Sequence, residues 1–285
     1  MRSPRSLIES FLLVCAAFVA ATAVAVQPVA AEIEGPPTNS WGVGELLTGT
    51  QNDSLRSYVF AIEQIGNRVY VGGRFGQVAD GNTAVDRPYI AAFDATTGDW
   101  ISSFTPELNG SVNALQTTPD GSRLFVGGDF SMVNGQSAGR LVALDPTTGA
   151  VDNGFAGALT SATVVRDFDI EGPWLYVVGG FNGVVSPVGN NLATRAARFD
   201  WQTGNHVPNW RPMVSGGTPW GVSASTTDRV YLAGEFNVVG GNSVIGGHAA
   251  VTKTDATYVP PKATSRTSRS LVIACTPAAT AGPTP

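Results

Sequence analysis

Charged side chains are scarce in this 285-residue sequence: Asp, Glu, Lys and Arg make up only 14% of it. Amphipathic surface helices need a charged outer face, so this composition disfavours a helical protein. The net charge of −5 comes from 17 basic and 22 acidic residues. Beyond the N-terminal region, Lys262, Arg266 and Arg269 form the one notable basic group. We therefore predict no nucleic-acid partner.

Cysteine and histidine are scarcer still, with two of each. Cys15 lies in an N-terminal apolar run, so only Cys275 remains once that segment is removed, and no internal disulfide is expected. His206 and His248 lie in separate loop-like stretches without an acidic or thiol companion at ligand spacing, which argues against a zinc site. A Gly-x-Ser-x-Gly elbow is also absent. The sequence predicts no catalytic residues, no metal and no cofactor.

Residues 1–31 read as a secretory signal peptide. Arg2 and Arg5 precede an apolar run over residues 11–26, and Val29-Ala30-Ala31 supplies the small residues that signal peptidases recognise. We expect cleavage before Glu32. The apolar run is shorter than the roughly 20 residues that a bilayer span requires. The prediction is a secreted or cell-surface protein with no membrane span after cleavage.

What the sequence has in abundance is glycine, at 34 positions, and much of it lies in a motif that recurs four times. The motif ends in Phe75, Phe130, Phe181 and Phe236, at intervals of 51–55 residues. An aspartate follows each one, at Asp94, Asp145, Asp200 and Asp255. The third motif reads Gly179-Gly180-Phe181 and is interpreted as lacking one residue before the phenylalanine. A fixed period of this length indicates stacked or radially arranged copies of one unit.

Each copy predicts four short antiparallel strands. In the second copy, apolar runs at residues 111–115, 123–126 and 140–145 are separated by Asp-Gly and Asn-Gly turns, and a fourth run follows near residues 151–155. A four-stranded meander cannot bury both faces alone, so the copies must cover one another. The predicted fold is all-β: a β-propeller of about four 51–55-residue, four-stranded repeats. A linear solenoid and an incomplete or truncated ring stay open as alternatives.

Two further patterns have local explanations. The segment Asp-x-x-Thr-Gly after the third strand, at Asp94, Asp145 and Asp200, predicts a type I turn in which the aspartate accepts backbone N–H groups and the glycine is left-handed. Six residues after each glycine comes an aromatic residue: Phe104, Phe155 or Trp210. We expect these rings to fill the gaps between adjacent copies.

The predicted organisation is a signal peptide over 1–31, a lead segment over 32–56, propeller repeats over 57–256 and a tail over 257–285. The tail is rich in Ala, Thr, Ser and Pro, a composition that predicts disorder. Blade number, ring closure, oligomeric state and calcium content do not follow from the sequence.

The repeated motifs resemble a known family. Val126-Gly127-Gly128-Asp129-Phe130, Val133-Asn134-Gly135, the RLVALD segment at 140–145 and Thr148-Gly149 are similar to the bacterial delta-sixty-type propeller repeat, over about residues 57–256. Such repeats stand at the front of large secreted or surface-attached bacterial proteins, often ahead of polycystic-kidney-disease-like or laminin-G-like domains. The resemblance implies a propeller fold and no enzymatic activity.

The predicted function is that of a secreted, non-catalytic interaction or scaffold module that binds an unidentified extracellular protein or glycan through its loops. Trp100 and Trp201 are the candidate ligand-contact aromatics. The alternative is a quinone-dependent (PQQ-like) dehydrogenase or a glycan-active propeller enzyme. Residues 92–100 look similar to the tryptophan docking motif of quinoproteins, although Trp100 follows Gly98 by two residues rather than about four, and the paired cysteines of that class are missing.

Overall fold

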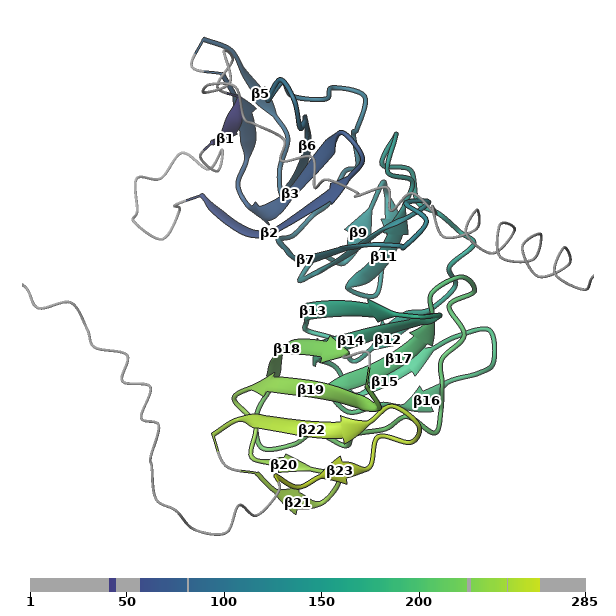
Figure 1. Ribbon diagram of the computed structural model, residues 1–285. Helices are drawn as coiled ribbons and strands as arrows, with labels where there is room; N and C mark the ends of the chain where they lie inside the picture. Colours follow the sequence, from purple (N-terminus) through teal and green to yellow (C-terminus); the bar gives the residue numbers. More distant parts are fainter. Residues whose placement is uncertain (1–40, 45–56, 81, 225–226, 245, 262–285) are drawn as a thin grey trace, which may run out of the picture. The chain divides into compact units, whose positions relative to one another are not determined.

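The computed structural model describes residues 41–44, 57–80, 82–224, 227–244 and 246–261 (Figure 1). In these ranges the protein is all-β, with short antiparallel strands and no helix. It follows that no helix of the described residues is suited to crossing a membrane. The all-β part of the fold prediction is confirmed.

Four main sheets follow one another along the chain, and each is an antiparallel meander. The first contains β2 (Tyr58–Ile65), β3 (Arg68–Arg74) and β6 (Ile90–Asp94). The second contains β7 (Val112–Thr117), β8 (Leu124–Gly128) and β11 (Leu141–Leu144). The third contains β13 (Val164–Glu171), β14 (Trp174–Gly180) and β17 (Ala196–Asp200). The fourth contains β18 (Pro219–Ala224), β19 (Arg229–Gly234), β22 (His248–Thr252) and β23 (Tyr258–Val259).

A small companion sheet accompanies each main sheet; the loop between the second and third strands of the main sheet forms it, and in the first and third cases a strand from before the main sheet, β1 or β12, joins it. The first joins β1 (Gly42–Gly44), β4 (Gln77–Ala79) and β5 (Ala84–Asp86), and the second joins β9 (Met132–Val133) and β10 (Gln136–Ser137). The third joins β12 (Ala158–Thr160), β15 (Gly183–Val185) and β16 (Asn191–Leu192), and the fourth joins β20 (Val238–Val239) and β21 (Asn242–Ser243).

The predicted fourth strand is much reduced. In the first three main sheets it consists of a single bridging residue: Trp100 opposite Phe93, Val151 opposite Leu144 and His206 opposite Phe199. Only the fourth main sheet has a two-residue strand there, β23. Three of the four main sheets in the described residues therefore have three strands, and none contains strands from both the first and the fourth motif. A closed ring is not shown.

One glycine in each motif holds the first two strands of its main sheet in register. Its own N–H donates to the carbonyl of a residue just before the third strand, at 2.7–3.2 Å. A Cβ on it would lie 1.9–2.5 Å from a carbonyl oxygen of the first strand or of the residue just before it. No side chain fits such a close approach. These glycines are Gly73, Gly128, Gly179 and Gly234.

The close approach coincides with a β-bulge in the first strand. The register shifts between Val59 and Ala61 in β2, and between Val112 and Ala114 in β7. Equivalent shifts occur in β13 and β18. A bulge turns the strand and brings its backbone against the neighbouring one. Backbone crowding at the bulge therefore explains why glycine stands at these four positions.

The third motif is not shorter than the others. Gly179 donates its N–H to Arg195 as Gly128 does to Arg140, so Gly180 corresponds to Asp129 rather than to Gly128. The difference lies one position earlier, where Val178 replaces a glycine. The interpretation that this motif lacks a residue before Phe181 is therefore wrong.

The Asp-x-x-Thr-Gly turns form as predicted. The Oδ1 atom of Asp145 accepts the N–H groups of Thr147 and Thr148, both at 2.8 Å, and Gly149 closes the turn with φ +79°. Asp94 and Asp200 make the same pair of contacts. These hydrogen bonds favour the ionised carboxylate, and those from Thr96 and Thr97 lower the pKa of Asp94.

The fourth motif uses a different residue at this turn. Ala256 donates its N–H to the carbonyl of Thr252, as each turn glycine does to its aspartate. Thr252 therefore occupies the aspartate position, Asp255 corresponds to the turn threonine, and the two side chains hydrogen-bond to each other at 2.5 Å. The assignment of Asp255 as the fourth copy of Asp94 is wrong.

Several sequence predictions lie outside the described residues. These are the signal peptide over 1–31, most of the lead segment over 32–56 and most of the tail over 257–285. Where those segments are described, they extend the sheets beyond the predicted repeat boundaries. Val43 pairs with Val78 in the first companion sheet, and Tyr258 of β23 pairs with Val251 in the fourth main sheet.

We expect Gly128→Ala to lower the free energy of unfolding by about 2–3 kcal/mol, because the new Cβ would overlap the Ser111 carbonyl oxygen. Urea denaturation measures this change. Gly221→Ala is the matched control. Gly221 lies in the first strand of the fourth sheet, and the first and second sheets have alanine, Ala61 and Ala114, at the same position. A Cβ on Gly221 would meet nothing closer than 3.7 Å. Equal losses in the two variants would contradict the steric explanation.

Candidate functional site

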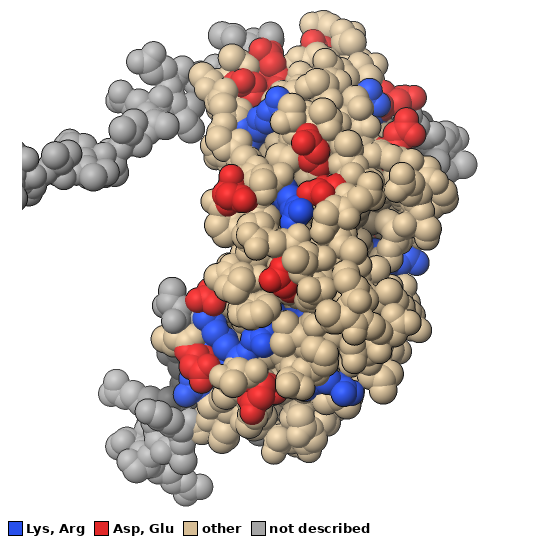
Figure 2. Space-filling view, turned by 90° about the vertical axis from the view of Figure 1, so that its right-hand side faces the viewer, with Lys and Arg blue, Asp and Glu red and all other residues tan. Residues whose placement is uncertain are grey.

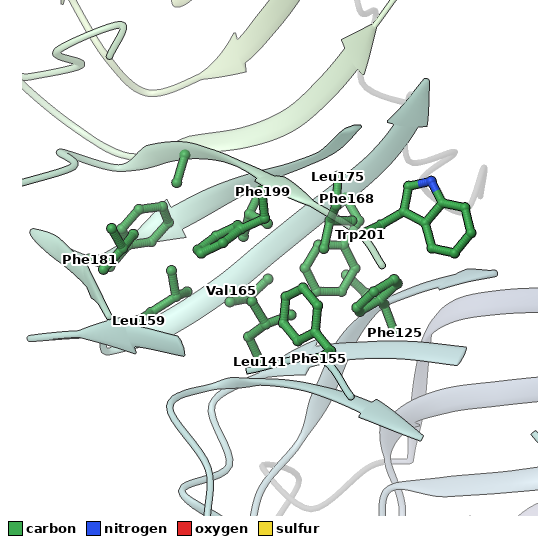
Figure 3. Packing of buried hydrophobic residues seen from close by; sticks show 14 of the residues in the cluster. Phe125, Leu141, Phe155, Leu159, Val165, Phe168, Leu175, Phe181, Phe199 and Trp201 are labelled. Atoms are coloured by element: carbon green, nitrogen blue, oxygen red, sulfur yellow. The ribbon is translucent and has the colours of Figure 1, made fainter. Parts of the chain in front are cut away.

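Successive main sheets are joined by rings that meet edge to face. The three predicted gap-filling aromatics are buried, and each contacts the aromatic residue of the preceding second strand. The pairs are Tyr70 with Phe104, Phe125 with Phe155 and Tyr176 with Trp210, with ring centroids 5.1, 4.9 and 5.1 Å apart. Figure 3 shows the middle junction, where Phe125 and Phe155 lie beside each other. The predicted role of these aromatics is confirmed.

Apolar residues of each first strand complete the junction with the sheet before it. A Cβ on Gly72 would lie 2.5 Å from Cγ1 of Val112, and a Cβ on Gly127 would lie 2.5 Å from Cγ1 of Val165. The glycine at this position therefore lets the next sheet pack closely. Val178 stands there in the third sheet, so the third junction has room for a side chain.

Carboxylates also link the first strands of neighbouring sheets. Glu63 accepts the N–H of Thr117 at 2.9 Å, and Asp167 accepts the N–H of Val222 at 2.9 Å. Asp169 makes the equivalent bond to Ala224 at 2.5 Å. Burial raises the pKa of Asp167 and of Asp169, because the low-dielectric junction disfavours the charged form. These carboxylates therefore have a structural role: they link one main sheet to the next by hydrogen bonds.

Among the described residues no main sheet precedes the first one, and side chains on its outer face are exposed. Ile62 is 65% exposed, whereas Leu115 and Phe168, at the same register position of later sheets, are 8% and 5% exposed. Val59 is 42% exposed, whereas Val112 is fully buried. We call this surface, with the exposed neighbours Tyr58 and Phe60, the leading face.

In the part of the chain that the structure describes, no main sheet follows the fourth one, and side chains on its opposite face are exposed. Tyr231 is 48% exposed, whereas its counterparts Tyr70 and Tyr176 are fully buried. A cavity of about 850 Å³ lies over this sheet. We call this surface the trailing face; the cavity residues that define it are Ser223, Tyr231, Ala233, His248, Ala250 and Val259.

The two faces are the candidate functional site, and the sequence prediction missed both. The sequence did contain a signal for these faces. Stacked repeats normally end in units with a polar outer face, so an apolar strand in a terminal motif indicates an uncovered surface. The first strand of the first motif, YVFAIEQI, is as apolar as its internal counterparts. The first motif therefore lacks the polar outer face expected of a terminal repeat, whereas the trailing face of the fourth combines apolar residues with Ser223 and His248.

The structure does not bring the two predicted ligand-contact tryptophans together. Trp100 is half-buried against Trp41, with ring centroids 5.5 Å apart, and the Arg87 guanidinium lies 5.7 Å from its centroid. Trp201 belongs to a different cluster. Its ring is buried and its Nε1–H donates to the Gly172 carbonyl at 3.0 Å, so it offers no free face for stacking. Trp201 is therefore withdrawn as a ligand contact.

The two histidines have different surroundings. His248 is exposed on the trailing face, whereas His206 is only 3% exposed and packs against Phe199, with ring centroids 5.6 Å apart. The burial of His206 does not follow from its place in a loop-like stretch of the sequence. Both of its ring nitrogens lack a hydrogen-bond partner among the described residues. Burial, assisted by the charges of Arg211 and Arg198, lowers the pKa of His206 to about 4.

Charge and metal-ligating groups add no further site. On the face shown in Figure 2, acidic and basic side chains are interspersed and separated by larger uncharged areas. Within the ranges that the structure describes, no group of three or more His, Cys, Asp or Glu side chains could hold a metal ion.

Comparisons with known proteins name no family for this chain. No protein-family model matches it, and no curated protein matches it. It is similar to the solved structure titled "Crystal structure of the computationally designed Ika4 protein", with 13% sequence identity and a TM-score of 0.44. The match covers 74% of this chain and 97% of that one. A likeness at this level supports no inference about function.

His206 predicts an acid-sensitive fold. Its pKa is depressed in the folded state, so the unfolded chain binds more protons below pH 6.5, and stability falls as pH decreases from 6.5 towards 4. We expect His206→Val to be more resistant to acid, with a relative gain of about 2 kcal/mol at pH 5 over pH 7.5. Urea denaturation at the two pH values measures the difference.

The control places the same imidazole at the equivalent position of the second sheet. Val151 bridges Leu144 as His206 bridges Phe199. Val151→His should add a loss of stability between pH 7.5 and pH 5. If wild type and His206→Val lose stability in parallel over this range, the buried neutral histidine is not the cause of the acid sensitivity.

Proposed function

We propose that the four main sheets are blades of a β-propeller and that the chain is a non-catalytic interaction or scaffold module outside the cell. The shared junction chemistry supports the blade assignment: the same aromatic pair, bulge and close-packed position recur from sheet to sheet. On this proposal, the single bridging residues Trp100, Val151 and His206 are shortened fourth strands. The delta-sixty-type resemblance and the predicted leader agree with a secreted bacterial module.

The observation that carries the interaction role is the pair of uncovered faces. Residues that are buried in every internal junction are exposed at both ends: Val59 and Ile62 on the leading face and Tyr231 on the trailing face. Contiguous apolar surface of this kind on a soluble protein is typical of interaction sites. The aromatic residues Tyr58, Phe60 and Tyr231 are of a type enriched in protein interfaces.

A catalytic role has less support. His206 is buried and therefore not presented to a substrate. Trp100, on which the quinone-dependent alternative rests, is packed between Trp41 and the Arg87 guanidinium. No observation favours that alternative or a glycan-active enzyme.

Two measurements test this proposed function. An apolar fluorescent dye, bis-ANS, should bind the highly diluted chain, and Tyr231→Ser should remove a large part of the signal. Leu192→Ser is the matched control, because Leu192 is 69% exposed but lies on the companion strand β16. In a separate assay, the chain is mixed with pyrroloquinoline quinone, a sugar or alcohol substrate and a redox dye. We expect no reduction of the redox dye. Equal dye binding by wild type and Tyr231→Ser, or quinone-dependent turnover, would overturn the proposal.

A further inference from the structure

We propose that the partner of the two uncovered faces is a second copy of this chain, bound head to tail. The leading face of one copy packs on the trailing face of the other, in the register of the internal junctions. Two such contacts close a ring of two chains. This inference rests on the proposed function and names the partner of the same surfaces.

The two faces are the two halves of one junction. At each internal junction, the trailing half supplies an aromatic residue and a close-packed position on the second strand, and the leading half supplies two apolar residues on the first strand. In the first junction, Tyr70 and Gly72 of the first sheet face the second sheet. Tyr231 and Ala233 stand at the same two positions of the fourth sheet. The first sheet presents Val59 and Ile62 in the positions of Val112 and Leu115.

The chain satisfies neither half itself, because Ile62 and Tyr231 are both exposed in the same molecule. Ala233 does not prevent a junction of this type, since the third junction forms with the larger Val178 at the equivalent position. Leading and trailing faces differ, so their contact is heterologous, and a heterologous contact gives either a closed ring or an open filament. Two chains of four sheets make eight blades, which is within the usual size of propellers.

Hydrogen bonds between the first strands of neighbouring sheets support the same register for the contact between two copies. At the first and third internal junctions, a side-chain oxygen on the first strand accepts an N–H from the first strand of the next sheet, as Glu63 does from Thr117 and Asp169 from Ala224. At the second junction, Asn113 Nδ2 instead donates to the Val165 carbonyl. The Ser223 hydroxyl stands at the Glu63 position on the trailing face, and Gln64 stands at the Thr117 position on the leading face. A second copy brings this hydroxyl to the backbone N–H of Gln64.

Sedimentation velocity and light scattering on the purified full chain test the proposal. Wild type should have twice the monomer mass at high concentration. Ile62→Glu, on the leading face, and Tyr231→Glu, on the trailing face, should each raise the dissociation constant by about 100-fold or more, because each places a charge in both junctions of the ring. Leu192→Glu should remain a dimer. Circular dichroism melts of all the variants check that each one is folded.

Mixing the two variants identifies the head-to-tail arrangement. A chain carrying Ile62→Glu keeps its trailing face, and a chain carrying Tyr231→Glu keeps its leading face, so the mixture contains one intact type of junction. We expect the mixture to form a heterodimer that neither variant forms alone. If one variant still dimerises by itself, the contact joins like faces, and the head-to-tail arrangement is overturned; a mixture that stays monomeric while wild type dimerises also overturns it.

Other outcomes are equally decisive. A wild-type monomer overturns the proposal, and shows that another occupant or another part of the same chain covers the faces. Species larger than a dimer overturn the closed two-chain ring. If the chain is a monomer that still binds bis-ANS through Tyr231, the proposed interaction role stands and the second copy as partner is rejected. If the monomer does not bind bis-ANS in this way, both proposals are rejected.

Discussion

The close approach of two backbones at one glycine is the constraint on which the rest of this structure depends. At Gly73, Gly128, Gly179 and Gly234 a Cβ would lie within 2.5 Å of a carbonyl oxygen at or just before the first strand. The bulge beside each glycine tolerates this contact and sets the register of the first two strands. That register decides which side chains face the preceding sheet and which face the next one. The junction chemistry, and therefore the two uncovered faces, follows from it.

The junctions divide their work between apolar packing and a few buried polar links. Aromatic pairs such as Tyr176 with Trp210 are buried there, and their edge-to-face arrangement adds a modest favourable term. Carboxylates such as Asp167 satisfy N–H groups of the next first strand and are buried in doing so. Each sheet thus relies on its neighbours for coverage, as expected where a unit cannot bury its own faces. The two end sheets have one neighbour each and leave an apolar surface exposed.

Departures from the common pattern are informative because the other sheets show what the position ordinarily holds. His206 stands where the second sheet has Val151, and its imidazole packs against the Phe199 ring without a hydrogen-bond partner among the described residues. Thr252 and Ala256 replace the aspartate and glycine of the turn, and the backbone there keeps the same hydrogen bond although Ala256 has φ +61°. The backbone geometry of this turn therefore tolerates changes in side-chain chemistry.

Local signals in the sequence were enough to predict the all-β class, the aspartate turns and the gap-filling aromatics. Turn residues such as Asp145 and Gly149 act within five positions of each other, and Phe155 keeps a fixed distance from the turn, so both can be recognised without knowing the packing. The burial of His206 and Trp201 and the exposure of Ile62 and Tyr231 could not be predicted in this way. Each depends on whether a neighbouring sheet, encoded about fifty residues away, covers that side chain. Only the tertiary structure decides that coverage, because apolar residues at the same positions of the first and second strands are buried in the internal sheets and exposed in the first and the last described sheet.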